Sequence, residues 1–386
     1  MANKPNIRFK GFTEDWEQRK LGDLLNETRE KTSVEDEDTL LSCAIDGMFL
    51  NSELFSHFRG SSNIGYLKVK KNDLILSAQN LHLGNCNVNL RFEHGIISPA
   101  YKVYELINCD PLFMQAWVKQ DKTKDFFLKA STEGASVCRK NIVWEELYKQ
   151  ELPVPKINEQ VKIGAFFQNL DNLITLHQRK CDDTKKLKKY MLQKMFPKNG
   201  EKKPEIRFAG FTDDWEQRKL EDVVEFLDTM RKPLEGAKRI SGSYPYYGAS
   251  GIVDYVDGYL FDEELILLSE DGANITDRNY PVCFLASGKY WVNNHAHVLR
   301  TKQGNENNFI CNSLERKDYT QYNTGMAMPK LNKETCKKIP ISCPEFEEQK
   351  KIGDYFRSLD HLITLHQRKC DDLKNLKKYM LQNMFV

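Results

Sequence analysis

A long segment of helical character occurs twice in this chain, and that repeat constrains the fold more than any other feature. Residues 171–193 (DNLITLHQRKCDDTKKLKKYMLQ) return as residues 360–382 with three of 23 positions changed. A second segment, 7–21 (IRFKGFTEDWEQRKL), returns as 206–220 (IRFAGFTDDWEQRKL). Because both segments recur in the same order, the chain consists of two copies of one unit.

Each copy of the helical segment carries apolar residues three and four positions apart, with one slip near Thr184. This spacing predicts a long helix with an apolar seam, as in coiled coils. The two helices are expected over Glu159–Phe196 and Glu348–Phe385, each after a proline-containing break. The residues predicted to form the seam are Ile163, Phe167, Leu170, Ile174, His177, Cys181, Leu187 and Met191 in the first helix, and Ile352, Phe356, Leu359, Ile363, His366, Cys370, Leu376 and Met380 in the second.

The segments between the repeats differ from each other. They run from about Asp23 to Val154 and from about Asp222 to Ser342, and the second is ten residues shorter. Short alternating stretches and an amphipathic stretch in each predict two α/β domains. Because the repeated segments are preserved and the domains are not, we expect one scaffold that presents two different recognition surfaces.

Local patterns predict several elements of these domains. In the first domain, Gly65–Ser77 predicts a hairpin, Gly95–Leu106 a second strand pair, and Pro111–Ala130 one helix. The second domain is expected to hold many short strands followed by a helix near Asn305–Tyr322. The copied segment 7–21 is interpreted as a packing motif that places Phe and Trp side chains in a core.

The composition, with 40% hydrophobic and 29% charged residues, is typical of a globular protein with a sizeable core. Ten cysteines without a C-x-x-C pair indicate free thiols in a reducing cytoplasm and argue against a zinc site. The first residues carry no apolar run, and no window approaches the length of a membrane span. The net charge of +2 neither requires nor excludes nucleic acid, so any basic surface must be local.

Motifs that would indicate an enzyme are missing from the sequence. There is no G-x-x-x-x-G-K-[ST] phosphate loop, no H-E-x-x-H and no N/D-P-P-Y/F run. His295 and His297 share one face of a predicted strand, where structural histidines, a polar DNA-binding surface and metal ligands are all open interpretations. Glu270 and Asp271 could form a carboxylate pair, but the following Gly272 favours a turn. The sequence therefore predicts no catalytic residue, metal site or cofactor in this chain.

Polar and basic residues at expected strand ends and loops are the candidates for DNA contact. Arg and Lys bond guanine edges and phosphates, Asn and Gln read adenine, and Tyr bonds phosphate or stacks on bases, although each is also common on a solvated surface. Two Gly-containing basic loops, 132–141 and 324–331, occupy equivalent places before the last short helix of each domain. The candidates are Lys68, Lys70, Lys71, Gln79, Asn80, Asn85, Arg91, Arg139 and Lys140 in the first domain, and Tyr246, Tyr247, Asn274, Lys289, Asn293, Asn294, His295 and Lys330 in the second.

The long helices also carry positive charge. Residues 171–196 contain seven Lys or Arg and three Asp. A solvated helix face explains this charge, and binding of acidic protein partners is the main alternative.

The order of these features resembles that of the specificity subunits of type I restriction–modification systems. The resemblance is carried by Leu152–Pro155 leading to Glu159-Gln160, and by Glu348-Gln349 in the second copy. In that copy Cys343-Pro344 replaces Pro153-Val-Pro155, which loses a proline but keeps the break.

Parts of the variable domains add to this resemblance. Tyr244–Ala249, with Gly288–Trp291 and Asn294-His295, looks like one class of target-recognition domain in the family. Gly95–Tyr101 looks like another class. Together with the repeats, the resemblance covers essentially the whole chain.

The resemblance implies two target-recognition domains, 1–155 and 201–344, each followed by a conserved helical spacer, 156–200 and 345–386. The spacers would pack as an antiparallel coiled coil about a pseudo-two-fold axis and fix the distance between the halves of a bipartite, asymmetric DNA target. Two methyltransferase subunits carrying S-adenosylmethionine, and two restriction subunits using ATP and Mg²⁺, would dock on this non-catalytic chain. A free-standing methyltransferase or nuclease of unrecognised type, and a coiled-coil scaffold that does not bind DNA, are the alternatives.

Overall fold

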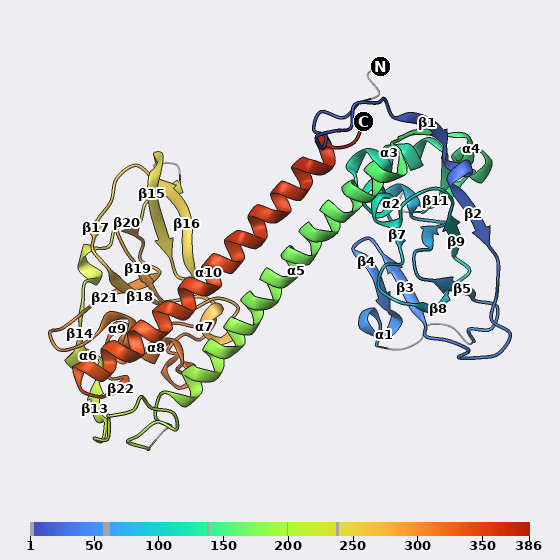
Figure 1. The fold of residues 1–386 in the computed structure, drawn as a ribbon. Helices are drawn as coiled ribbons and strands as arrows, with labels where there is room; N and C mark the ends of the chain where they lie inside the picture. The colour runs from blue at the N-terminus through green and yellow to red at the C-terminus, as the bar shows by residue number, and fades with distance from the viewer. Residues whose placement is uncertain (1–3, 57–61, 137–138, 199, 237–238) are drawn as a thin grey trace. The chain divides into compact units, whose positions relative to one another are not determined.

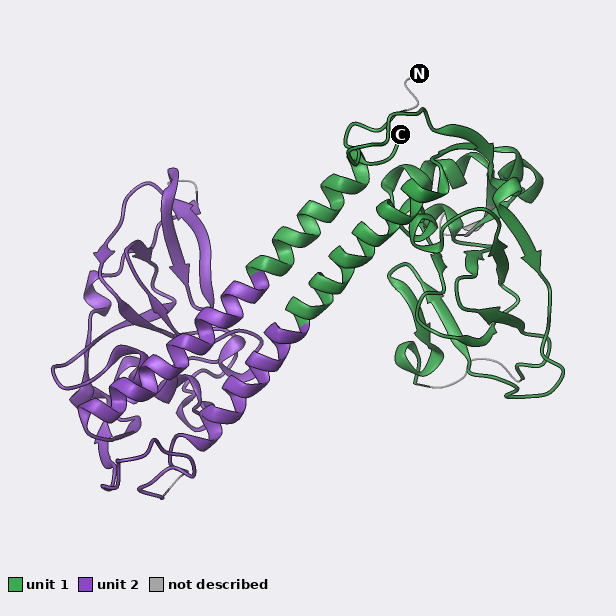
Figure 2. Cartoon of the chain, in the orientation of Figure 1, with its two compact units in different colours: residues 1–178, 368–386 green, residues 179–367 purple. Residues whose placement is uncertain are grey.

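The computed structural model describes residues 4–56, 62–136, 139–198, 200–236 and 239–386 (Figure 1). The chain divides into two compact units, one of residues 1–178 and 368–386 and the other of residues 179–367 (Figure 2). Each unit contains one globular domain together with part of each long helix. Within the described residues, no helix combines the length and the apolar character needed to cross a membrane.

The two long helices are α5 (Ile157–Lys194) and α10 (Phe346–Asn383), which begin and end two residues before the predicted positions. In the first unit, Lys377 Nζ donates to Asp171 at 2.5 Å and Cys370 Sγ to Gln178 at 3.6 Å. As α5 advances by seven residues its partner on α10 recedes by seven, so the helices run antiparallel here. Contacts of Cys181 with Gln367 and of Lys188 with Asp360 give the same direction in the second unit.

Most of the predicted seam faces the interior. Ile163, Phe167, Leu170 and Cys181 are buried, as are their counterparts Ile352, Phe356, Leu359 and Cys370; Ile174, His177 and Met191, with Ile363, His366 and Met380, are half-buried. The prediction was wrong for Leu187 and Leu376, whose side chains are 44% and 43% exposed. Beyond the slip near Thr184 the inward position moves on by one residue, and Lys188 and Lys377 occupy it. A straight helix of 3.6 residues per turn drifts away from a 3.5-residue repeat in this way.

The globular domain of the first unit is built on an antiparallel sheet in the order β2-β9-β6-β7. Its strands are β2 (Leu25–Thr28), β6 (Leu74–Ser77), β7 (Cys86–Val88) and β9 (Tyr101–Leu106). Smaller pairs are β3 (Leu41–Ala44) with β4 (Gly47–Leu50), β5 (Leu67–Lys70) with β8 (His94–Ile97), and β10 (Ser131–Ser136) with β11 (Arg139–Ile142).

The domain of the second unit contains two four-stranded sheets, in the orders β14-β21-β18-β19 and β16-β15-β20-β17. The first sheet holds β14 (Val224–Phe226), β18 (Leu265–Ser269), β19 (Cys283–Ala286) and β21 (Ala296–Thr301). The second holds β15 (Ser241–Gly248), β16 (Gly251–Val256), β17 (Phe261–Asp262) and β20 (Lys289–Val292). The short connecting helices of this domain are α6 (Leu220–Val223), α7 (Asn274–Asp277) and α9 (Lys333–Lys337), with 3₁₀ turns at Asp228–Met230 and Thr320–Tyr322. The first unit has short helices α1 (Asn51–Leu54) and α4 (Trp144–Lys149), with 3₁₀ turns at Leu21–Leu24 and Leu81–Leu83.

The two domains share one connectivity although their sequences show no convincing identity. Strands β2, β6, β7 and β9 correspond in order and pairing to β14, β18, β19 and β21. The β5–β8 pair corresponds to β17–β20, and the parallel bridge between Leu40 and Ile96 corresponds to the parallel pairing of β15 with β20. The central strands β6 and β18 are buried along their whole length, which explains why both are runs of Leu and Ile ending in Ser.

Some local predictions were corrected by these pairings. The strands expected in Gly65–Ser77 exist, but β5 pairs with β8 while β6 pairs with β7 and β9, so they form no hairpin. The pair expected in Gly95–Leu106 is likewise divided between two sheets. The helix expected over Pro111–Ala130 is two helices, α2 (Pro111–Val118) and α3 (Asp121–Lys129). In the second domain the helical region is α8 (Asn307–Glu315), followed by a separate 3₁₀ turn.

The copied N-terminal segment is a packing motif, as predicted. Trp16 and Trp215 are buried in their respective units. The Glu-Gln-Arg-Lys strand that follows each Trp pairs with the strand before the long helix. These strands are β1 (Glu17–Lys20) with β12 (Glu151–Val154), and β13 (Glu216–Lys219) with β22 (Pro340–Cys343).

The start of α5 explains the Glu-Gln-x-Lys-Ile-Gly sequence physically. Buried Glu159 accepts two hydrogen bonds of 2.7 Å from Arg8, in the copied segment. Gln160 accepts from the backbone N–H of Asp110, the N-cap of α2, and donates to a backbone carbonyl before α5. At Gly164 a Cβ atom would lie 2.6 Å from the backbone of α2, so glycine permits the close approach. In the second unit the equivalent residues are Glu348, Arg207, Gln349, Glu306 and Gly353.

Candidate nucleic-acid interface

In the first unit, three loops meet where the buried strand β6 ends. The N–H of Ala78 donates to the carbonyl of Ala100 at 2.9 Å, and the N–H of Lys140 donates to the carbonyl of Gln79 at 3.1 Å. The loops after β6 and after β8 and the segment at the start of β11 are therefore fixed to one another by backbone hydrogen bonds.

The same three loops meet in the second unit. The N–H of Glu270 donates to the carbonyl of His295 at 2.9 Å, and that of Leu331 donates to the carbonyl of Glu270 at 2.7 Å. Asp271 also forms a β-bridge with Lys330. The predicted equivalence in position of the two Gly-containing basic loops is confirmed by these contacts. Their role in DNA contact stays a prediction.

In the second unit, a buried ion pair between His297 and Asp228 lies on the core side of these loops. His297 is 1% exposed; its Nδ1 lies 2.9 Å from Asp228 and its Nε2 lies 2.7 Å from the carbonyl oxygen of Leu331. Because both ring nitrogens face acceptors, the ring is held as the imidazolium. Burial by itself lowers the pKa of His297, but its hydrogen bonds to Asp228 and Cys336 outweigh burial and raise it to about 10. His297 is thus a structural histidine.

Nearer the surface, Asp271 and Arg231 hold these loops in place through hydrogen bonds. Asp271 accepts from the ring of His295 at 2.9 Å, and the side chain of Asn293 accepts from the His295 N–H. Arg231 donates to Glu270 and to the carbonyl of Ala296. Glu270 and Asp271 therefore shape the loops and do not form a paired carboxylate site.

The predicted DNA-contact residues of the first unit fall into three groups. Lys68, Lys71 and Arg91 take part in surface ion pairs with Glu30, Glu37, Glu93 and Glu53, which are weak enough to rearrange. Lys70 and Gln79 are exposed, whereas Asn80, Asn85 and Lys140 are half-buried. The side chain of Arg139 lies outside the described part of the structure. The meeting of loops brings Gln79, Asn80 and Lys140 together.

In the second unit the prediction was wrong for Tyr246. This side chain is 1% exposed, its hydroxyl accepts the N–H of Leu234, and the guanidinium of Arg239 lies 4.6 Å from the ring centroid. Tyr247 is half-buried against Phe284 and Tyr290. Both rings were predicted as polar groups near a strand end, but Leu234 and Arg239 cover Tyr246, and Phe284 and Tyr290 pack against Tyr247.

The remaining candidates of the second unit differ in accessibility. Asn293 is 7% exposed, and the amide of Asn274 bonds the backbone of Tyr280 and Pro281 to close its own loop. Lys289 is exposed, with its ammonium 4.7 Å from the Tyr259 ring. Asn294, His295 and Lys330 are exposed where the three loops meet. From the sequence, Asp271 was predicted only as part of a carboxylate pair or a turn, and Ser98–Ala100 only as part of a stretch that resembles a recognition domain. The contacts of Asp271 with His295 and of Ala100 with Ala78 were not predicted.

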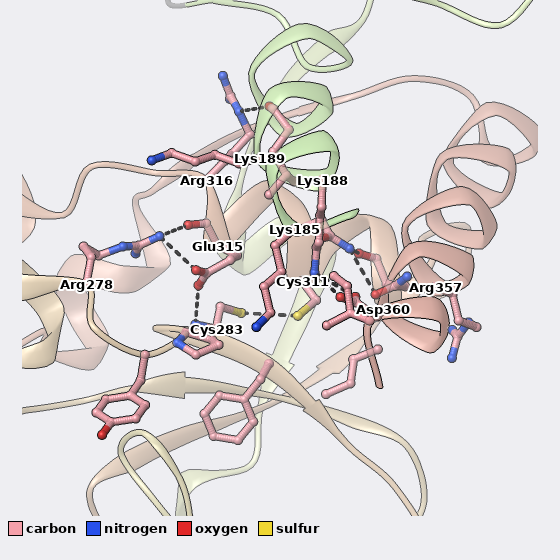
Figure 3. Close-up of a pocket in the computed structure, with 18 of the residues that line it drawn as sticks. Lys185, Lys188, Lys189, Arg278, Cys283, Cys311, Glu315, Arg316, Arg357 and Asp360 are labelled. Carbon is pink, nitrogen blue, oxygen red and sulfur yellow. Dashed lines mark hydrogen bonds and ion pairs between the residues drawn. The ribbon is translucent and has the colours of Figure 1, made fainter. Parts of the chain in front are cut away.

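A second surface lies beside the long helices. In the second unit, a groove of about 900 Å³ runs between α5, α10 and α8 (Figure 3). Lys188 donates to both oxygens of Asp360 at 2.6 and 2.7 Å, and Arg278 pairs with Glu315 at 3.0 Å. Burial raises the pKa of Glu315. Other cationic side chains that line the groove are Lys185, Lys189, Arg316 and Arg357.

The first unit contains an equivalent groove of about 830 Å³. Lys377 and Asp171 form its ion pair, in the positions of Lys188 and Asp360. Repeated helix residues thus line both grooves, while the globular walls differ. The repeated lining residues are Lys374, Lys377, Lys378, Leu381, Gln382, Asp171 and Ile174 here, and Lys185, Lys188, Lys189, Leu192, Gln193, Asp360 and Ile363 in the second unit.

Both long helices also leave apolar side chains exposed outside the buried seam. On α5 these are Leu173, Leu176, Leu187 and Tyr190, at 42–50% exposure, and on α10 they are Leu362, Leu365, Leu376 and Tyr379, at 40–55%. Each unit therefore presents two leucines from one helix and a leucine and a tyrosine from the other. Such a repeated exposed apolar set is typical of a surface that binds a partner.

Comparisons with known proteins agree with this duplicated architecture. A family model of the type I restriction modification DNA specificity domain matches residues 13–183 and again residues 212–375. A putative type I restriction enzyme specificity subunit of Haemophilus influenzae is 36% identical over 150 residues, which span 39% of this chain and 38% of that protein. The MjaVIII specificity subunit of Methanocaldococcus jannaschii is 24% identical over 95% of this chain and 91% of the relative.

Solved structures share the fold. The crystal structure of the S subunit of a type I restriction–modification system from M. genitalium covers 99% of both chains, with a TM-score of 0.67 and 14% identity. A chain from a structural study of the assembly of the type I system covers 96% of this chain and 97% of its own length, with a TM-score of 0.51 and 16% identity. Since the family model matches most of this sequence in two copies, the chain belongs to the type I restriction–modification specificity subunits, the non-catalytic DNA-recognition components of these systems.

Proposed function

We propose that this chain directs its complex to a bipartite, asymmetric DNA target, with one half read by each globular domain. The support is that the two domains share a connectivity and a meeting of three loops but carry different side chains there. Exposed Gln79 and half-buried Lys140 lie there in the first unit, and exposed His295 and Lys330 lie there in the second. Amide and basic side chains of this kind contact base edges and phosphates. One framework with two sets of contacts suits two unequal half-sites.

The long helices serve two further purposes in this proposal. As an antiparallel coiled coil they set the distance between the half-sites, and their repeated exposed leucines and tyrosines receive one methyltransferase subunit at each unit. Two restriction subunits complete the complex. S-adenosylmethionine, ATP and Mg²⁺ are held by those partners, and the complex works in the cytoplasm, where its cysteines stay reduced.

One observation carries the proposal. The apolar side chains that the repeated helix segments expose are the same in both units, whereas the side chains where the loops meet are not. Two equal docking surfaces and two unequal reading surfaces are what a subunit requires when it positions two identical enzymes on an asymmetric sequence.

Base-resolution mapping of methylated adenine in cells with and without this chain tests the reading function. We expect a two-part motif that depends on the chain. His295→Ala with Lys330→Gln should relax or abolish one half of the motif, and Gln79→Ala with Lys140→Gln should affect the other half only. Methylation that does not change when the chain is removed, or a motif altered in both halves by either variant, would contradict the proposal.

Docking is tested separately by assembly with the methyltransferase. Leu187→Glu and Leu362→Glu place charges on the exposed apolar set of the second unit, and we expect one of the two methyltransferase subunits to be lost. The matched control is Lys186→Glu, an exposed charged position on the same turn, which should leave assembly intact. Full assembly of the Leu variants would show that the partner binds elsewhere.

A further inference from the structure

The loop of residues 323–331 in the second unit ends in an apolar tip that the proposed function does not use. Met326 is fully exposed and Met328 is 59% exposed, with Ala327 between them. Within the described residues, Met326 is the most exposed of the large apolar side chains. Exposed apolar side chains gathered at one point indicate a contact surface.

The neck of this loop is held tightly. The side-chain oxygen of Asn323 accepts from the N–H of Gly325 at 2.9 Å and from that of Lys330 at 2.8 Å. The N–H of Thr324 donates to the carbonyl of Lys330 at 2.8 Å. A Cβ atom at Gly325 would lie 1.8 Å from the carbonyl oxygen of Met328, so glycine is required for the neck to close. The methionines therefore stand on a fixed base, and their cost of ordering on binding is small.

The neck is joined directly to the candidate nucleic-acid interface. The N–H of Gly272 donates to the carbonyl of Pro329 at 3.0 Å, and Asp271, which bridges to Lys330, also holds the ring of His295. On the core side, the carbonyl of Leu331 accepts from His297 at 2.7 Å. These contacts thus fix the apolar tip, the exposed ring of His295 and Lys330 to one another.

The equivalent loop of the first unit reads Thr-Glu-Gly-Ala-Ser-Val-Cys-Arg-Lys over residues 132–140 and contains no methionine. A partner that docks on both units would use residues that both units share, as the long helices provide. A feature confined to one reading surface instead fits a contact with one half-site. DNA, rather than a protein subunit, is therefore the occupant that the loop favours.

We propose that Met326 and Met328 make an apolar contact with base pairs of the half-site read by the second unit, an inference that rests on the proposed function. Unbranched thioether side chains adapt to irregular surfaces, and methionine is among the apolar residues that proteins insert at base steps. Lys330, at the neck, is placed to contact the adjacent phosphate. The tip supplies sequence preference and the lysine supplies charge.

The two contributions differ in salt dependence, which gives the test. Contacts to phosphates release counterions and steepen the loss of affinity with salt, whereas apolar contacts to bases do not. The measurement is the dissociation constant of the chain, assembled with its methyltransferase partners, for a duplex carrying the mapped target, at several salt concentrations. The variants are M326Q/M328Q, which keeps length but adds polarity, M326L/M328L, which keeps apolar character, and K330Q.

We expect M326Q/M328Q to weaken binding about tenfold or more with an unchanged salt slope, and M326L/M328L to bind within about threefold of the unsubstituted chain. K330Q should flatten the salt slope. Unchanged unfolding temperatures and unchanged assembly would show that the tip itself is responsible.

Three outcomes would overturn the inference. They are binding by M326Q/M328Q within about twofold of the unsubstituted chain, a salt slope altered by the Gln variant, and a loss of methyltransferase assembly in that variant. The unsubstituted chain distinguishes this failure from that of the proposed function. If it prefers its mapped target over unrelated DNA and the Gln variant binds equally well, only the role of the tip is wrong; if it shows no preference, the proposed function is wrong as well.

Discussion

The backbone N–H of Ile7 donates to the carbonyl oxygen of Asn383, 2.9 Å away, so the first motif of the chain closes on the last helix. The N–H of Ile206 donates to Lys194 at the same distance in the second unit. Each globular domain is thus completed by the end of the helix that belongs, in sequence, to the other copy.

The aromatic residue just beyond each helix end should therefore stabilise the domain of its own unit. Phe385 packs against Trp16, Phe113 and Phe167, with ring centroids 5.5–6.1 Å apart, and is 4% exposed. We expect Phe385→Ala to lower the free energy of unfolding of the first unit by about 3 kcal/mol. Differential scanning calorimetry should show one transition lowered and the other unchanged. The matched variant Phe196→Ala should lower the opposite transition, and a uniform shift in both would contradict the division into units.

Alanine at the two equivalent helix glycines should have unequal effects. A Cβ at Gly164 meets the Phe113 backbone and the Leu112 side chain at 2.6 Å, so the packed helices must separate, at a cost of about 2 kcal/mol. A Cβ at Gly353 meets the flexible carboxylate of Glu306, which can move away. The loss of that N-cap, about 1 kcal/mol, is largely offset by the better helix propensity of alanine. Chemical denaturation of both variants checks this, and equal losses would refute it.

The stability of the second unit should decrease in alkaline solution. The pKa of His297 is raised to about 10 in the folded chain, above the unfolded value of about 6.5. The stabilisation is therefore complete below pH 6.5 and is lost as pH rises through 10. His297→Gln removes the cation nearest to Asp228 and leaves Arg231, 3.7 Å away, so it should cost about 3 kcal/mol at pH 6. The difference in melting temperature between the two proteins should narrow toward pH 10, and a constant difference would contradict the raised pKa of His297.

The distance between half-sites should follow helix length. Insertion of seven residues at facing positions of α5 and α10 preserves the seam and adds about 10.5 Å. At about 3.4 Å per base pair, the spacer in the methylated motif should lengthen by about three base pairs, with both half-sequences unchanged. Insertion in α5 alone is the control and should disrupt folding. Unchanged spacing in the doubly extended chain would rule out the helices as the determinant.

The repeats could be predicted in detail because their determinants are local. The spacing of apolar residues predicted the ends of the long helices to within two residues, and the copied Trp segments were correctly assigned to cores. The prediction was wrong at Leu187 because the seven-residue repeat was continued past the break in apolar spacing near Thr184. The contact of Lys188 with Asp360 shows which face of α5 points inward beyond that break.

The reading surfaces could be predicted only in part. Lys330 and Lys140 were correctly placed in equivalent loops. Tyr246 proved to be buried, because the residues that cover it, Leu234 and Arg239, cannot be identified from the sequence of its own strand. Likewise, strand pairing in Gly65–Ser77 depends on β6 becoming the buried centre of a sheet, a non-local choice.

The sequence by itself determined that this protein is a duplicated unit with two equal helices and two unlike domains. The tertiary structure alone decided that the unlike domains share one connectivity, and that each is completed by the other copy's helix. The physical reason is that helix periodicity depends on residues close together in the sequence. Sheet order and burial depend instead on which distant segments pack against one another and exclude water.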